Sequence, residues 1–140
     1  MRFESSTLIA AGRETVWAVL ADVRRWPQWT ASMSTVEPAG AGPIGPGSKV
    51  RVKQPKLPPS TWTVTEFEAG SSFTWVSRMP GVTTTAWHRL EPADGDRTRA
   101  SVGISQSGPL SGLVGLLGGP IIRRYLAMEA QGLRQRCEPS

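Results

Sequence analysis

Residues 109–138, PLSGLVGLLGGPIIRRYLAMEAQGLRQRCE, constrain the architecture more than any other segment of the chain. They form the only segment long enough for a multi-turn helix that spans a small domain, and they come last. Pro120 separates an apolar first half from an amphipathic second half and is expected to kink or split the helix. A single stripe of the second half carries Ile122, Leu126, Glu129 and Leu133.

The first half of this helix, residues 110–119, contains Gly112, Gly115, Gly118 and Gly119. Each glycine inside a helix costs about 1 kcal/mol relative to alanine, so four of them need an explanation. Two explanations are open. Either the glycines allow the sheet to approach the helix closely, or this half of the helix is a mobile lid over an interior space.

The segments before this helix read mainly as strands separated by turn residues. In residues 48–54, Val50 and Val52 alternate with cationic side chains, as expected for a strand with one buried face. The pairs Pro-Gly at 80–81 and Asp-Gly at 94–95 are turn signals between consecutive strands. We expect strands over residues 2–10, 48–54, 61–68, 73–79, 82–91 and 98–106, and a loop over residues 38–47.

Short helices are expected near the N-terminus, over residues 14–20 and 23–26, and Pro27 limits the second of them. Consecutive strands joined by short turns favour an antiparallel meander. The order of strand, short helices, many strands and one long terminal helix predicts an α+β fold. In this fold a curved antiparallel sheet closes around the last helix and encloses a cavity.

The length of 140 residues predicts one domain over residues 1–140. The longest apolar run is far shorter than the ~20 residues of a membrane-spanning helix, and the N-terminus lacks a signal-peptide hydrophobic region. Cys137 is the only cysteine, so no internal disulfide can form and a reducing compartment is favoured. We expect a cytoplasmic protein that is a monomer or a homodimer.

The net charge of +5 raises the question of a nucleic-acid partner, but the cations are spread along the chain. A solvated, basic surface is the favoured interpretation, which makes nucleic-acid binding unlikely. A regulatory or RNA-contacting role for the strand with Lys49, Arg51 and Lys53 stays open as an alternative. One histidine and one cysteine cannot build a usual zinc site, and no nucleotide-binding motif is present, so we expect neither a metal nor a cofactor.

Several motifs resemble one known family. Residues 14–22, ETVWAVLAD, and 26–29, WPQW, resemble the opening of START-related helix-grip proteins (SRPBCC), in the branch named polyketide cyclase/dehydrase and lipid transport. Residues 88–92, HRLEP, and 108–112, GPLSG, with 125–130, YLAMEA, fit the same branch. The resemblance covers nearly the whole chain. It implies a seven-stranded antiparallel sheet around the C-terminal helix, with two small helices and an apolar ligand pocket.

Six tryptophans supply the aromatic residues that a pocket for flat apolar molecules would use. Trp17 is expected in the core, while Trp26 and Trp29 are either core or pocket wall. Trp87 should face outward and be exposed, by strand alternation. The side chains expected to contact a ligand are Trp26, Trp29, Trp62, Val64, Phe73, Trp75, Ser77, His88, Leu113, Leu117 and Tyr125.

His88 and Glu66 are the candidate catalytic residues. Alternation points His88 inward, where it has either a structural partner or a ligand to hydrogen-bond. Glu66 shares parity with inward residues, so either it is buried and paired or a bulge turns it outward. Family members bind lipids, polyketides, plant hormones or aromatic compounds, and some are enzymes. Aromatase/cyclase relatives carry a pocket serine and arginine on a mid-sheet strand, where this sequence has Val64 and Glu66.

We therefore expect a protein that binds a small hydrophobic ligand, such as a lipid, a polyketide or an aromatic compound, between the sheet and the last helix. The alternative is a polyketide cyclase, aromatase or dehydratase in which His88 or Glu66 moves a proton.

Overall fold

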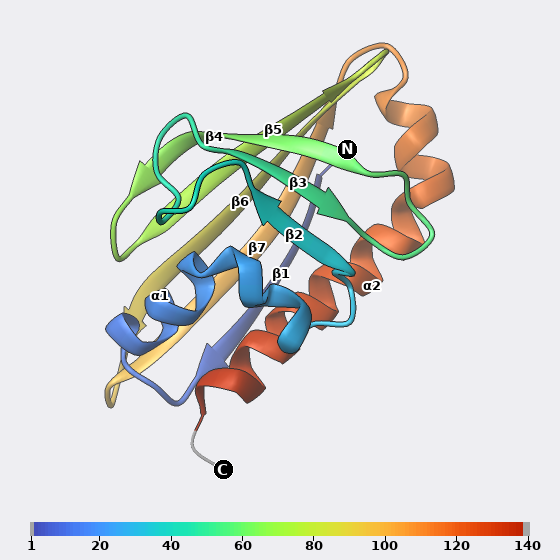
Figure 1. Cartoon of the computed structure of the whole chain (residues 1–140). Helices are drawn as coiled ribbons and strands as arrows, with labels where there is room; N and C mark the ends of the chain where they lie inside the picture. Colours follow the sequence, from blue (N-terminus) through green and yellow to red (C-terminus); the bar gives the residue numbers. More distant parts are fainter. Residues whose placement is uncertain (1, 139–140) are drawn as a thin grey trace.

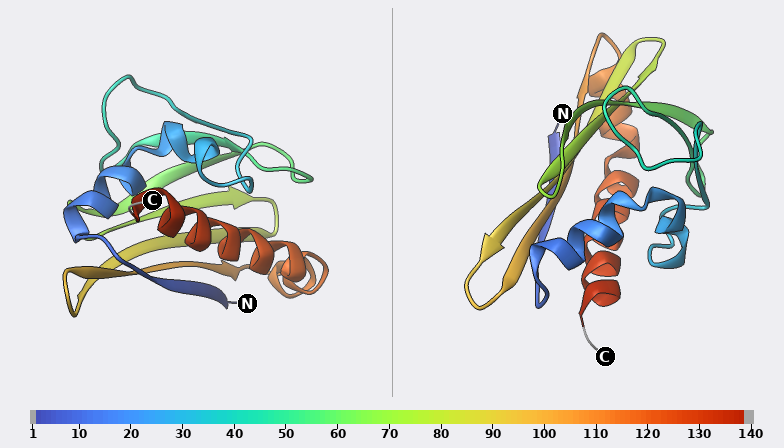
Figure 2. Two further views of the ribbon diagram at one scale, coloured as in Figure 1. Left: turned by 90° about the horizontal axis from the view of Figure 1, so that it is seen from below. Right: turned by 60° about the vertical axis from the view of Figure 1, so that its left-hand side comes forward.

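A computed structural model describes residues 2–138 and shows a seven-stranded antiparallel sheet that curves around a long C-terminal helix (Figure 1). The strand order is β1-β7-β6-β5-β4-β3-β2. Figure 2 shows the helix α2 lying along the concave face of this sheet. The elements are β1 Arg2–Ile9, α1 Arg13–Ala21, the 3-10 helix η1 Val23–Gln28, β2 Thr35–Pro38, β3 Lys49–Lys53, β4 Ser60–Glu68, β5 Ser72–Met79, β6 Val82–Ala93, β7 Arg97–Ser107 and α2 Ser111–Cys137.

The meander expected from the turn signals is present, because β2 to β7 pair in chain order and β1 then adds to β7. The expected α+β helix-grip fold is confirmed. The sequence patterns did not identify β2 individually, since four residues are too few to show an alternation. None of the helices in residues 2–138 is long and apolar enough to cross a membrane.

The register places the aromatic side chains of the inner face side by side. Phe73 of β5 pairs with His88 of β6, and Trp75 pairs with Ala86. Ala86 in turn pairs with Ile104 of β7. Because residues that are directly opposite in an antiparallel pair share a face, these side chains all point toward α2 and η1.

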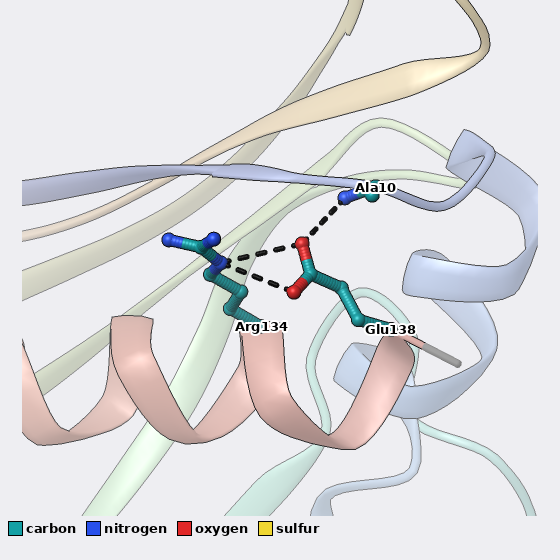
Figure 3. A network of polar contacts seen from close by, with 3 residues as sticks. All are labelled: Ala10, Arg134 and Glu138. Atoms are coloured by element: carbon teal, nitrogen blue, oxygen red, sulfur yellow. Dashed lines mark hydrogen bonds and ion pairs between the residues drawn. The ribbon is translucent and has the colours of Figure 1, made fainter. Parts of the chain in front are cut away.

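The helix α2 is continuous through Pro120 rather than split. Its first turns, orange in Figure 1, run in a different direction from the red remainder, which is the bend that an internal proline produces. The C-terminal end of α2 is tied to the end of β1 (Figure 3). There Glu138 accepts hydrogen bonds from the Ala10 backbone N–H at 2.8 Å and from Arg134 Nε at 3.2 Å, and the first of these lowers the pKa of Glu138.

The glycines of α2 do not all have the same role. A Cβ atom added at Gly112 or Gly118 would meet nothing closer than 4.0 Å, so close packing does not explain these two glycines. Gly119 faces the Phe3 ring at an ordinary contact distance of 3.5 Å. The close approach occurs in the second half of the helix instead, where a Cβ on Gly132 would overlap the Trp29 carbonyl oxygen.

Trp87 faces away from α2, as alternation predicts, but the expectation that it is exposed is wrong, because only 5% of its surface is accessible. Its ring lies over Gly103 of β7, where any Cβ would overlap it. Its Nε1 donates a 2.8 Å hydrogen bond to Glu4, and the Arg2 guanidinium lies 4.3 Å from the ring centroid. Glycine on β7 and long polar side chains on β1 thus bury an indole on the outer face of the sheet.

Candidate functional site

A cluster of aromatic rings from η1, β5 and β6 fills part of the space between the sheet and the helices. His88 stacks on Phe73 with centroids 4.3 Å apart and an interplanar angle of 19°. Trp26 of η1 lies 5.3 Å from both Trp75 and His88. Trp26 and Phe73 are fully buried. These rings pack on one another as a hydrophobic core does, so the open hollow expected here is reduced to a small residual space.

This residual space, the inner pocket, has a volume of about 30 Å³. This is more than the roughly 10–15 Å³ that a site needs to hold one water molecule. Most of its wall is apolar, and its polar side chains are Gln54, His88 and Glu129. The inner pocket is lined by Trp26, Met33, Val52, Gln54, Trp62, Trp75, Ala86, His88, Gly103, Ile104, Leu126 and Glu129.

A second space, the outer cleft, adjoins the inner pocket and has a volume of about 180 Å³. The two spaces share Gln54, Trp62 and Ile104 as wall residues. The walls of the outer cleft come from the β3–β4 loop, from β4 to β7 and from residues of α2 on both sides of Pro120. They are Gln54, Leu57, Pro58, Ser60, Trp62, Ser77, Met79, Thr84, Ile104, Gln106, Val114, Gly118, Ile121 and Ile122.

His88 lies on β6, is 3% exposed and lines the inner pocket. Its Nδ1 is 3.3 Å from the Phe73 carbonyl oxygen. Because a carbonyl oxygen only accepts, Nδ1 carries the proton in the neutral ring and Nε2 is the acceptor. Burial lowers the pKa of His88 to about 4, against the opposing effect of the Phe73 hydrogen bond, so the ring is neutral at pH 7.

Glu129 of α2 also lines the inner pocket and is 6% exposed. Burial raises the pKa of its carboxyl group to about 8, so the group is mainly protonated at pH 7. Within residues 2–138 no hydrogen bond or ion pair of the Glu129 carboxyl group is found. The sequence showed an acid in the apolar stripe of the last helix, but Glu129 was not selected as a site residue.

Glu66 is exposed and lies outside both spaces. The register between β4 and β5 shifts between Val64 and Glu66. This bulge adds a residue to β4, which reverses the alternation and brings Phe67 to the inner side. The outward orientation was one of the two outcomes expected for Glu66.

Leu113 and Leu117 are also outside the cleft, with 56% and 74% of their surfaces exposed. The structure therefore does not place them in the cleft, and their contact with a ligand stays a prediction. Val114 and Gly118, one residue further along in each case, face the cleft instead. This half of the helix is apolar on most sides, so the sequence gives no stripe from which the inner face can be chosen.

The remaining candidates divide into cleft and core residues. Trp62, Trp75 and Ser77 line the two spaces, as expected. Val64 and Phe73 are buried in the core and line neither space. Trp29 packs on Trp26, with centroids 5.7 Å apart, and against Gly132 of α2, away from the cleft. The Tyr125 hydroxyl donates to the Pro55 carbonyl oxygen and so holds the β3–β4 loop on α2.

Two further features bear on what this site can do. Over the residues that the structure describes, no three His, Cys, Asp or Glu side chains are grouped so that they could hold a metal ion.

A larger groove of about 330 Å³ lies elsewhere, between α1 and the loop that contains Ile44, and it is open to solvent. The cleft between sheet and α2 is smaller but more apolar, and it adjoins the buried titratable groups, so it is the better candidate site.

Comparison with known proteins gives one family. The sequence profile described as polyketide cyclase/dehydrase and lipid transport matches residues 1–138. No protein of curated function matches the sequence significantly.

The fold is similar to several solved structures. A START superfamily protein from Mycobacterium smegmatis has a TM-score of 0.74 and 16% identity over 97% of this chain and 96% of that chain. An aromatase/cyclase from a Streptomyces species has a TM-score of 0.78 and 18% identity over 98% and 93%. A hypothetical protein from Helicobacter pylori has a TM-score of 0.82 and 16% identity over 99% and 88%. At these identities the likeness is one of fold.

Since the profile covers nearly the whole sequence, the chain belongs to the family described as polyketide cyclase/dehydrase and lipid transport, and its fold is that of the solved structures above.

Proposed function

We propose that the protein binds a small, largely apolar molecule in the outer cleft. The observation that carries this proposal is the cleft itself, about 180 Å³ of mainly apolar space between the sheet and α2. Burial of a ligand against Trp62, Ile104 and Ile122 would supply most of the binding free energy, at roughly 25 cal/mol per Å² of apolar surface removed from water. The family description, which includes lipid transport, agrees with an apolar ligand.

The size of the cleft limits the ligand. Sites for drug-sized molecules have volumes of roughly 300–1,000 Å³, and the outer cleft is smaller. A single aromatic ring or a short aliphatic chain fits this space without rearrangement. A lipid or a folded polyketide needs the first half of α2 to move outward, which its glycines at positions 112 and 118 make easier.

The test uses two helix glycines that differ only in what they face. At Gly118 a larger side chain would project into the cleft, whereas Gly112 is exposed and has open space around it. We expect Gly118→Leu to abolish the binding of toluene and of short aliphatic alcohols, measured by calorimetry and native mass spectrometry. Gly112→Leu should bind them as the unaltered protein does. Equal affinity in the two variants, or no binding to the unaltered protein, would refute the proposal.

A second candidate is proton-transfer chemistry of the cyclase or dehydratase kind, favoured by the position of His88 next to the cleft. A neutral imidazole with a free acceptor nitrogen can remove a proton from a bound substrate. We expect His88→Gln to abolish any turnover of a short poly-β-ketone chain while leaving its binding measurable. Unchanged turnover in that variant would exclude His88 as the base.

A further inference from the structure

The inner pocket is lined by a hydrogen-bond donor and a hydrogen-bond acceptor, and no residue of the described structure is bound to both. Glu129 approaches from α2 and His88 from β6, and the rest of the wall is aromatic, aliphatic or backbone except for Gln54. No other titratable side chain among residues 2–138 lines this pocket. In its protonated form the carboxyl group of Glu129 donates one hydrogen bond, and Nε2 of His88 accepts one.

We propose that the inner pocket binds the hydroxyl group of an alcohol or phenol between Glu129 and His88. This inference rests on the proposed function, because the apolar body of that ligand would occupy the outer cleft. A hydroxyl group donates one hydrogen bond and accepts another through the same oxygen, so one atom can satisfy both side chains. The pocket volume of about 30 Å³ is sufficient for one such oxygen.

The protonation states restrict the ligand further. Burial keeps His88 neutral and Glu129 protonated near pH 7, so the pocket carries no charge to pair with an ionic ligand. A carboxylate or an ammonium group would lose its hydration without gaining an opposite charge, which is strongly unfavourable. A hydrocarbon would leave both the Glu129 donor and the His88 acceptor without partners. The site should therefore favour a neutral hydroxyl compound over its charged and its purely apolar analogues.

Three compounds of similar size separate these cases: phenol, toluene and benzoate. We expect the unaltered protein to bind phenol roughly tenfold more tightly than toluene, as two net hydrogen bonds of modest strength imply. Benzoate should bind more weakly than both. Isothermal calorimetry at a pH of about 6.5, below the pKa of Glu129, gives the three affinities.

Two variants of Glu129 assign the preference to its side chain. Glu129→Leu removes the donor and should bind toluene at least as tightly as phenol. Glu129→Gln keeps an N–H donor at nearly the same place and should retain a preference for phenol. Thermal unfolding of both variants checks that they are folded.

Infrared spectroscopy provides a readout that does not depend on affinity. The difference spectrum between the unaltered protein and Glu129→Gln should contain the C=O band of a protonated carboxylic acid. Saturation with phenol should shift that band, because the acid then donates to the ligand.

The outcomes distinguish this inference from the proposed function. Equal affinity for phenol and toluene, or an infrared band that phenol does not shift, would overturn the hydroxyl site while leaving the apolar cleft as a binding site. If neither compound binds the unaltered protein, both proposals are wrong.

Discussion

Glu129 lies on the apolar stripe of α2 and is buried, which is an unusual environment for a carboxyl group. The sequence places an acid among Ile122, Leu126 and Leu133 on the buried stripe of the last helix. The structure shows that this acid lines a pocket into which the only histidine of the chain also points. The periodicity of the helix alone indicates that Glu129 is unusual, because a glutamate is rarely buried on an apolar stripe unless it has a partner or a function. Its partner across the pocket could be found only from the fold.

The buried acid predicts a specific dependence of stability on pH. The pKa of Glu129 is about 8 in the folded protein and 4.5 in an ordinary glutamate, so the folded state binds this proton more tightly than the unfolded state. The resulting stabilisation is complete below pH 4.5 and is lost as the pH rises toward 8. Relative to Glu129→Gln, the unaltered protein should therefore lose a few kcal/mol of unfolding free energy across this range.

Urea unfolding of both proteins at a series of pH values provides the measurement. The comparison removes the contribution of His88, whose pKa is lowered to about 4 and which therefore favours the folded state at higher pH in both proteins. A constant difference between the two proteins from pH 4.5 to 8 would show that Glu129 is not buried in its acid form.

For Glu66, strand alternation in the sequence indicates an orientation that the structure does not have. Parity along β4 places it with Trp62 and Val64 on the inner face, and one register shift places it in solvent instead. A bulge moves every later residue of the strand to the other face of the sheet. The residue types in this segment do not indicate that a bulge is present.

The elements with a clear period were predictable, and β1, α1 and η1 also lie close to the ranges expected for them. Alternation identified β3 to β7, and length identified α2, because both signals follow from the geometry of the backbone. The first half of α2 has apolar side chains on most sides, so the orientation of Leu113 and Leu117 followed from tertiary packing alone. The strand β2 is defined by its pairing with β3 rather than by its own pattern.

The two halves of α2 should respond in opposite ways to the same substitution. Gly132→Ala places a methyl group on the Trp29 carbonyl oxygen and should destabilise the protein by about 1–3 kcal/mol, as overpacking does. Gly112→Ala enters open space on an exposed helix face and should stabilise by up to about 1 kcal/mol. Urea midpoints at an unchanged slope would measure both effects.

A loss of stability at Gly112 as large as that at Gly132 would mean that the first half of α2 is packed more closely than the structure shows. A gain at both positions would mean that η1 and α2 are not in contact at Trp29. Either result would require a different arrangement of the helices over the cleft.

For the whole molecule, the sequence predicted the sheet wrapped around a helix but overestimated the hollow between them. A row of inward aromatic residues is compatible with a pocket wall and with a packed core. The structure shows that Trp26 of η1 enters the space and packs on Trp75 and His88, which closes the deep end. What remains is a cleft beside α2, and next to it a small pocket lined by His88 and Glu129.

The five isoleucines of the chain are placed so that they report which space a ligand enters. Ile104, Ile121 and Ile122 line the outer cleft. Ile9 lies in the core, and Ile44 lines the larger open groove beside α1. Selective labelling of isoleucine methyl groups therefore distinguishes ligand binding in the outer cleft from binding in the core or in the groove beside α1.

Titration of the methyl-labelled protein with toluene and with phenol, followed by NMR, is the most direct test of ligand binding between the sheet and α2. We expect saturable shifts of the methyl signals of Ile104, Ile121 and Ile122, with those of Ile9 and Ile44 unchanged. No shift at millimolar concentrations of either compound, or a shift confined to Ile44, would contradict the account.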